Sequence, residues 1–315
     1  MGRLVIASQL DDSFNEAFAR HIEDVDIVPA PRGVPSELPS GAEVLVAAPF
    51  RRAGGALAGP PPGWPFDLRW VQLVSVGIDF YPDWLFQGPV VTSARGSSAV
   101  ALAEFGLAAI LSAAKRMPQI WIGGAADWAP RPLALVQGTT LGLVGFGSIG
   151  EALAPRAQAL GMNVIATRRS TAPIEVPGVE RIERIGDLFE RSDHVVLAAP
   201  STPETVGIVG RATLARAKPG LHLINIARGA LIDDDALLRA LDEGRVALAS
   251  LDVTHPEPLP EGHPFYSHPR VRLSPHTSVH TPDTRANLAA LFARNLHRFR
   301  QGEPLADVVD LARGY

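Results

Sequence analysis

Residues 140–150 read Thr-Leu-Gly-Leu-Val-Gly-Phe-Gly-Ser-Ile-Gly, an apolar run followed by three closely spaced glycines. These glycines have the spacing GxGxxG and stand between a predicted strand, residues 140–144, and a predicted helix, residues 151–160. In such a setting the first glycine permits a tight turn, the second lets the backbone approach a pyrophosphate, and the third lets helix and strand pack closely. We therefore predict a dinucleotide site at this helix N-terminus, the alternative being a purely structural turn. Its residues are Gly145, Phe146, Gly147, Ser148, Ile149 and Gly150.

The same alternation of strand and helix continues on both sides of this turn. Short apolar runs predict later strands at residues 164–167, 194–199, 221–226, 246–251 and 271–273, and earlier ones at 4–7, 25–28, 44–48, 70–75 and 90–92. Helical patterns are clearest over residues 14–22, 99–117 and 283–300. Near-continuous apolar strands that alternate with helices are typical of parallel sheets covered on both faces, so we predict the α/β class.

The composition is that of a globular protein with two domains and a small-molecule ligand. Hydrophobic residues make up 46% and charged residues 20% of 315 residues, and the net charge of -4 offers no basic surface for nucleic acid or anionic lipid. The first residues predict a strand rather than a signal peptide, and no apolar run predicts a membrane span. The sequence has no cysteine and no familiar zinc-binding spacing. We expect a cytoplasmic protein with no metal, nucleic-acid or membrane partner.

The residues after the next strand indicate which cofactor is preferred. Rossmann domains that bind NAD usually place an acidic residue there to hold the ribose 2′-hydroxyl. Here Arg168, Arg169 and Ser170 follow the strand instead. Two guanidinium groups and a hydroxyl suit a 2′-phosphate, so we predict NADP as the preferred cofactor and NAD as the second choice. The alternative is that these are solvated turn residues.

The order of several motifs resembles the D-isomer-specific 2-hydroxyacid dehydrogenase family, of the glyoxylate/hydroxypyruvate reductase type, over nearly the whole chain. Besides the glycine motif, they are VSVGID at 74–79, APSTPET at 199–205, NIARG at 225–229, LDV at 251–253 with EPLP at 257–260, and SPHT at 274–277. The resemblance implies two doubly wound parallel-sheet domains, Rossmann-like and flavodoxin-like, with the nucleotide domain inserted in the substrate domain. We expect a substrate domain at 1–95 and 286–315, a dinucleotide domain at 96–285, and a homodimer.

Three residues are predicted to be catalytic. Arg228 follows an apolar strand, where α/β sheets bind ligands, and by the resemblance it binds the substrate carboxylate and polarises the keto oxygen. His276 matches the family's catalytic position, and histidine is a suitable general acid near neutral pH. Glu257 would hold the His276 ring and stabilise its protonated form. A structural arginine and an exposed histidine are the alternatives.

The remaining site residues come mainly from the resemblance. Asp252 is expected to bond the nicotinamide carboxamide, unless it is an ordinary turn residue. Backbone amides at Val76 and Gly77 are expected to help Arg228 and His276 hold the substrate. Arg51 and Arg52 could meet a distal anion, although an exposed basic loop explains them better. We also assign Pro200, Ile226, Ala227, Arg228 and His276 to the cofactor site.

These residues together predict reduction of a small 2-keto acid to a D-2-hydroxy acid, with glyoxylate or hydroxypyruvate as the first candidates. A nucleotide-sensing binding protein on the same fold is one alternative, and it predicts cofactor binding without turnover. A dehydrogenase of phosphite or formate is another, and it predicts turnover of either acid above that of every 2-keto acid.

Overall fold

The computed structural model describes residues 3–50 and 59–314, which divide into two compact units. The first unit combines Met1–Ser98 with His280–Tyr315, and the second is Ala99–Val279. The boundaries that we expected from the sequence, after residues 95 and 285, lie a few residues away. Within the described part of the chain, no helix is both long and apolar enough to cross a membrane.

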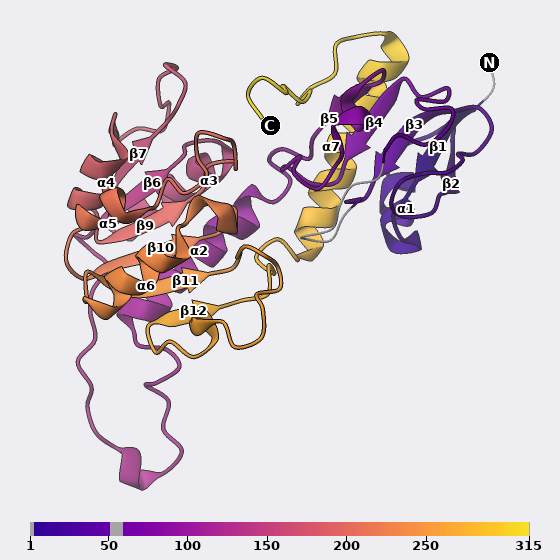
Figure 1. Cartoon of the computed structure of the whole chain (residues 1–315). Helices are drawn as coiled ribbons and strands as arrows, with labels where there is room; N and C mark the ends of the chain where they lie inside the picture. Colours follow the sequence, from indigo (N-terminus) through magenta and orange to yellow (C-terminus); the bar gives the residue numbers. More distant parts are fainter. Residues whose placement is uncertain (1–2, 51–58, 315) are drawn as a thin grey trace. The chain divides into compact units, whose positions relative to one another are not determined.

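The first unit is built on a parallel sheet of five strands in the order β2-β1-β3-β4-β5 (Figure 1). Its strands are β1 (Leu4–Ser8), β2 (Val25–Pro29), β3 (Ala42–Ala47), β4 (Trp70–Leu73) and β5 (Val90–Thr92). Helices α1 (Asp12–Ala19) and α7 (Pro282–Gln301) cover one face, where Phe18 and Trp70 both stack on Phe292. This strand order is the flavodoxin-like one, and α7 comes from the far end of the chain.

The second unit is built on a parallel sheet of seven strands in the order β12-β11-β10-β9-β6-β7-β8. Its strands are β6 (Thr140–Val144), β7 (Asn163–Thr167), β8 (Val179–Arg181), β9 (His194–Leu197), β10 (Leu221–Asn225), β11 (Val246–Leu251) and β12 (Val271–Leu273). All neighbours pair in parallel. The chain starts at β6 in the middle, builds outward through β7 and β8, and then returns to β9 on the other side, which is the Rossmann order.

Helices cover both faces of this second sheet, as near-continuous apolar strands require. Helices α2 (Ala99–Ala114) and α3 (Ser148–Ala159) pack on one face, around a core that includes Ile110, Leu153 and Ile224. On the other face lie α4 (Ile185–Arg191), α5 (Arg211–Ala215) and α6 (Asp234–Asp242). The seven-stranded sheet is therefore doubly wound. Both units are parallel-sheet structures of the predicted α/β class.

Several predicted element ends are wrong by a few residues, for local reasons. Helix α3 begins at Ser148 rather than at residue 151, because Gly147 is already its N-cap. Helix α2 ends at Ala114 rather than at residue 117, because Arg116 turns into the left-handed region with φ of 54°. Strand β4 ends at Leu73, and the residues after it form a turn instead of extending the strand to residue 75.

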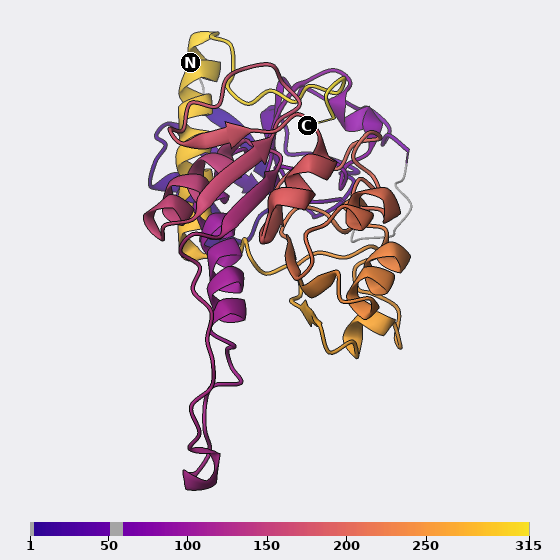
Figure 2. The same ribbon diagram turned by 90° about the vertical axis from the view of Figure 1, so that its left-hand side faces the viewer.

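A long excursion, which we call the arm (residues 115–139), joins α2 to β6. Figures 1 and 2 both show it running away from the sheet of its own unit and back, with the short helix η2 (Ala125–Asp127) near its far end. Its large apolar side chains are strongly exposed: Trp121 by 68%, Trp128 by 80% and Leu135 by 71%. The sequence patterns did not indicate this projection.

Candidate functional site

The carboxyl edge of the seven-stranded sheet collects the residues that the sequence singled out in the second unit. Because every strand is parallel, all the loops that follow the strands leave from this one edge. The order of the strands reverses between β6 and β9, and ligands of such sheets bind in the crevice at that switch point. The glycine loop follows β6, and the loop of residues 198–205 follows β9.

The three glycines of the loop after β6 have different structural surroundings. A side chain at Gly145 would lie 2.8 Å from the backbone of Ala199, and one at Gly150 would lie 2.9 Å from the ring of Phe146. A side chain at Gly147 would meet nothing within 4 Å, so packing within the chain does not require glycine there. Gly147 is the N-cap of α3, and no side chain caps that helix start. These features fit a dinucleotide whose pyrophosphate approaches the Gly147 backbone and the first amides of α3.

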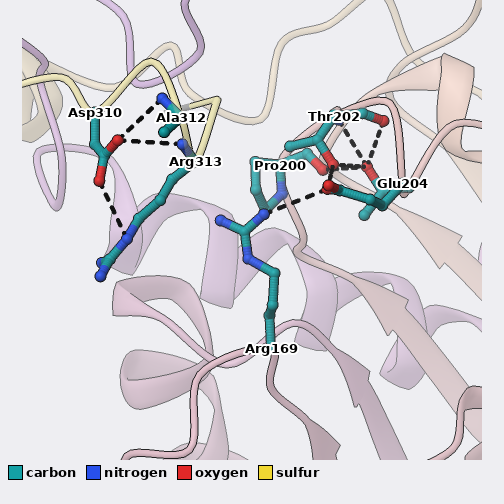
Figure 3. Close-up of polar contacts among 8 residues, drawn as sticks. Arg169, Pro200, Thr202, Glu204, Asp310, Ala312 and Arg313 are labelled. Carbon is teal, nitrogen blue, oxygen red and sulfur yellow. Dashed lines mark hydrogen bonds and ion pairs between the residues drawn. The ribbon is translucent and has the colours of Figure 1, made fainter.

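The two arginines after β7 have different surroundings. Arg168 donates from Nη1 to the carbonyl of Pro173 at 3.0 Å, which holds its own loop. Arg169 extends toward the loop after β9, where its Nη1 lies 3.4 Å from Oε2 of Glu204 (Figure 3). Ser170 is exposed. Of the predicted phosphate cradle, Arg169 is thus the member that faces a neighbouring loop.

That neighbouring loop is fixed by its own hydrogen bonds. Thr205 Oγ1 donates to the carbonyl of Pro200 at 2.7 Å and accepts from the amide of Thr202 at 2.7 Å. Thr202 Oγ1 in turn donates to Glu204 Oε2 at 2.9 Å, as Figure 3 shows. Pro200, which we assigned to the cofactor site, lies exposed at the start of this turn. The sequence analysis missed Glu204 as a site residue, although the motif at 199–205 contains it.

The end of β10 brings Arg228 toward the loop that carries Glu257. Asn225 accepts from the amide of Ala227 and donates to the carbonyl of Arg228, so its side chain closes the turn. A side chain at Gly229 would lie 2.0 Å from the backbone of Thr254, so only glycine lets this turn lie against the loop after β11. Arg228 is partly buried and its Nη1 donates to the carbonyl of Ala227 at 2.8 Å. Ile226 and Ala227 are buried.

His276 and Glu257 form a close pair. His276 Nδ1 lies 2.9 Å from Glu257 Oε2, and both side chains are partly exposed, by 30% and 26%. When Nδ1 of a histidine donates to a carboxylate, Nε2 is the nitrogen that is left to exchange a proton with a ligand. His276 itself adopts φ of 51°, a left-handed conformation that is uncommon for residues other than glycine and costs about 1 kcal/mol. Neighbouring groups must therefore stabilise the left-handed backbone conformation of His276.

Asp252, which directly follows β11, stabilises the backbone around His276 through hydrogen bonds. Its Oδ1 accepts from Ser274 Oγ at 2.5 Å and from the amide of Thr277 at 3.0 Å. Its Oδ2 accepts from both the hydroxyl and the amide of Ser278, and its carbonyl accepts from the His276 amide at 2.8 Å. With the side chain 1% exposed and four donors in place, Asp252 anchors the His276 loop. Its expected contact with the nicotinamide stays a prediction. The sequence analysis missed Ser274 and Ser278, whose signal is that they flank the histidine.

The charges of the pair act on each other. Burial alone would raise the pKa of Glu257, but this effect is outweighed by the hydrogen bond from His276 and the charge of that ring. The amide of Thr254 and the charge of Arg228 act in the same direction, so the pKa of Glu257 is lowered. Burial likewise opposes ionisation of Asp252, yet its serine and amide donors lower its pKa. Both carboxylates are therefore ionised at neutral pH.

The other predicted substrate residues lie in the first unit. Val76 is exposed and Gly77 partly buried in the turn that follows β4, where Ser75 Oγ donates to the carbonyl of Gly77 at 2.7 Å. The contact of this turn with substrate stays a prediction. Arg51 and Arg52 lie outside the described residues. Among the residues that are described, no group of three histidine and carboxylate side chains could hold a metal ion.

Comparison with known protein families identifies the class of this protein. The family model named "D-isomer specific 2-hydroxyacid dehydrogenase, NAD binding domain" matches residues 107–278, which is more than half of the chain. The chain therefore belongs to the D-isomer-specific 2-hydroxyacid dehydrogenase family and is an oxidoreductase. The family and the α/β fold that we predicted from the sequence are confirmed.

Individual relatives agree with this family. Glyoxylate/hydroxypyruvate reductase A of Serratia proteamaculans is 33% identical over 79% of this chain and 82% of its own length. D-3-phosphoglycerate dehydrogenase of Methanocaldococcus jannaschii is 33% identical over 71% of this chain, which spans only 44% of that protein. Among solved structures, a D-isomer specific 2-hydroxyacid dehydrogenase from Xanthobacter autotrophicus Py2, in complex with NADPH and MES, covers 100% of both chains with a TM-score of 0.80 and 26% identity.

Proposed function

We propose that this protein reduces a small 2-keto acid, glyoxylate or hydroxypyruvate, to the D-2-hydroxy acid, with NADPH as the preferred cofactor and His276 as the proton donor. The observation that carries the proposal is the His276–Glu257 pair, joined at 2.9 Å beside the Arg228 turn. The Serratia relative, which is named a glyoxylate/hydroxypyruvate reductase, supports the substrate class. The NADPH bound to the Xanthobacter protein, together with Arg169, supports the cofactor.

The residues of the site divide the work of the reaction. The glycine loop and Arg169 would hold the dinucleotide, and its nicotinamide, when bound, would supply a hydride for the keto carbon. His276 holds a proton at Nε2 and delivers it to the carbonyl oxygen, while Glu257 fixes the ring and stabilises its positive charge. Arg228 grips the substrate carboxylate and draws electron density from the keto oxygen. Asp252 keeps the His276 loop in its left-handed conformation, so the proton is held at one position.

The test is an initial-rate assay of absorbance loss at 340 nm. Wild-type protein is given NADPH or NADH with glyoxylate, hydroxypyruvate, pyruvate, phenylpyruvate and 2-ketoisocaproate. In the oxidative direction it is given NADP⁺ or NAD⁺ with phosphite or formate, and turnover is then followed as a gain of absorbance at 340 nm. We expect the highest kcat/KM with NADPH and one of the first two acids. Faster turnover with NADH would overturn the cofactor preference alone, and dinucleotide binding without turnover of any acid would overturn the enzymatic proposal.

We further propose that the protein is a homodimer in which a second copy covers the arm. Trp121, Trp128 and Leu135 leave a large apolar area exposed on one extended segment, and such areas on proteins mark association surfaces. Because aromatic residues are enriched in interfaces, a second copy would bury what the chain itself leaves exposed. Light scattering coupled to size-exclusion chromatography tests this, and a monomeric mass at assay concentrations would contradict it. The cytoplasmic location stays a prediction.

A further inference from the structure

The arginine that we assign to the cofactor 2′-phosphate already faces a carboxylate. Arg169 and Glu204 come from the loops after β7 and β9, two strands that flank β6 in the sheet. Their side chains point toward each other in Figure 3, with 3.4 Å between Nη1 and Oε2. Rossmann domains recognise the ribose 2′ position with residues that directly follow the strand equivalent to β7, as Arg169 does here. When the cofactor is NAD, an acidic residue there usually binds the 2′-hydroxyl.

Glu204 is held in this place by its own loop. The hydroxyl of Thr202, a residue that is only 5% exposed, donates to the same Oε2 atom that faces Arg169. Thr202 is fixed in turn by the hydrogen bond from its amide to Thr205 Oγ1. The orientation of the carboxylate is therefore set by a buried residue rather than by the arginine alone.

The ion pair is nevertheless weak enough to be exchanged. The Arg169 and Glu204 side chains are 47% and 72% exposed, and ion pairs between exposed groups contribute little because water and salt screen them. A phosphate monoester carries more charge than a carboxylate and offers three acceptor oxygens to a guanidinium. A 2′-phosphate can therefore replace Glu204 on Arg169, against the repulsion of the nearby carboxylate.

We propose that Glu204 is a specificity-determining residue: its carboxylate accepts a hydrogen bond from the 2′-hydroxyl of NAD(H) and competes with the 2′-phosphate of NADP(H) for Arg169. The acidic residue that is missing after β7 is thus supplied by the loop after β9. The chain accepts both cofactors, and Glu204 limits its preference for the phosphorylated one. This inference rests on the proposed dinucleotide function. It assigns recognition of the ribose 2′ position to a residue that follows β9 rather than β7.

Binding of two fragments that differ only at the 2′ position tests this without turnover. Isothermal calorimetry with 2′,5′-ADP and with 5′-AMP is done on wild type and on Glu204→Gln, which keeps the shape of the side chain and removes its charge. We expect 2′,5′-ADP to bind about fivefold more tightly, the effect of releasing an exposed ion pair. 5′-AMP should bind about threefold more weakly, the effect of a weakened hydrogen bond. The kcat/KM ratio for NADPH over NADH should rise in parallel.

A matched control and a second variant separate this inference from the proposed cofactor preference. Glu180→Gln removes the same charge from another exposed pair of the same unit, with Arg191, and should leave both affinities unchanged. An unchanged ratio of the two affinities in Glu204→Gln, or an equal shift in Glu180→Gln, would overturn the role of Glu204. Arg169→Gln should weaken the binding of 2′,5′-ADP and leave that of 5′-AMP unchanged. If it does so while Glu204→Gln has no effect, the NADP preference stands and this inference fails. If Arg169→Gln has no effect, the preference itself fails.

Discussion

The two edges of the seven-stranded sheet each hold a histidine with a polar partner, in opposite surroundings. At the carboxyl edge, His276 follows β12 on a loop, remains partly exposed, and pairs with Glu257. At the amino edge, His222 is the second residue of β10 and only 4% exposed. Its ring lies 3.0 Å from Ser250 Oγ and 3.3 Å from the ring of His194, and neither neighbour is an anion.

The electrostatics of the two sites follow from these partners. Burial, together with the charges of His194 and Arg272, lowers the pKa of His222 to about 3, so this ring stays neutral at neutral pH. Burial also lowers the pKa of His194, although Asp193 opposes the shift. The partner of His276 is instead a carboxylate whose pKa is lowered below its usual value. The same residue type is thus a structural hydrogen-bonding group at one edge and a candidate proton donor at the other.

The largest effect should separate the two histidines by activity. His276→Gln removes the proton donor and is expected to lower kcat/KM for glyoxylate or hydroxypyruvate by about 10²–10⁴-fold, the usual contribution of general acid catalysis. His222→Gln, at the other edge, is expected to keep the wild-type kcat/KM per folded molecule. Steady-state rates at 340 nm, with the folded fraction measured by circular dichroism, make the comparison.

Dinucleotide binding provides the control for the first variant, because an intact nucleotide site shows that the loss is chemical. If His276→Gln retained kcat/KM within about tenfold of wild type, a different group would be the proton donor. If both histidine variants lost activity equally, the distinction between the two edges would have no catalytic meaning.

A smaller loss of activity is expected when the charge of Glu257, the anionic partner that His222 lacks, is removed. Glu257→Gln keeps a hydrogen-bonding partner for His276 but removes its negative charge, so we expect kcat/KM to fall by about 10–100-fold, the scale of a hydrogen bond to a charged group. Because the hydrogen bond and charge of His276 lower the pKa of Glu257, the two groups are coupled, and removing this carboxylate should change the shape of the pH profile rather than lower the rate equally at every pH. Rates measured from pH 5.5 to 9 test this, and a profile that merely drops at every pH would reduce Glu257 to a structural role.

The fold was largely predictable because it depends on local patterns of residues. Apolar runs of the right length marked the strands, and the glycine motif after residues 140–144 located the switch point of the sheet. Element ends were less predictable, since they depend on single backbone conformations such as that of Arg116. The arm was missed for a different reason. Its exposed tryptophans resemble core residues when only their type is known.

The site was predictable where a recognisable motif contains its residues, as for the contact between Glu257 and His276, while the catalytic roles of Arg228, Glu257 and His276 stay predictions. It was not predictable where a role arises from loops that follow different strands. The clamp of Asp252 on Ser274 and Ser278 joins the ends of β11 and β12, and the Arg169–Glu204 pair joins those of β7 and β9. The buried ring of His222 is similar, because its partners come from β9 and β11.

The smallest effect concerns the free energy of unfolding, which should depend on pH because of His222 at the amino edge. The folded protein holds His222 neutral down to a pKa of about 3, whereas an unfolded chain titrates histidine near 6.5. Below pH 6.5 the unfolded state therefore binds a proton that the folded state does not, and stability is lost as the pH falls from 6.5 toward 3. For His222 alone we expect the loss at pH 5.5 to be about 1 kcal/mol relative to pH 7.5.

Urea unfolding at pH 7.5 and 5.5 measures this loss in wild type, in His222→Gln and in His276→Gln. The decrease between the two pH values should shrink in His222→Gln and persist in His276→Gln, because the lowered pKa that causes it belongs to the buried ring of His222. A second measurement covers the case in which His222→Gln does not fold: the ring resonances of His222 in wild type, followed by NMR, should not titrate between pH 7.5 and 5.5. Titration of His222 in that range would mean that the amino edge accepts a protonated histidine without a carboxylate partner, and the contrast between the two edges would then not explain why the proposed proton donor lies beside Glu257.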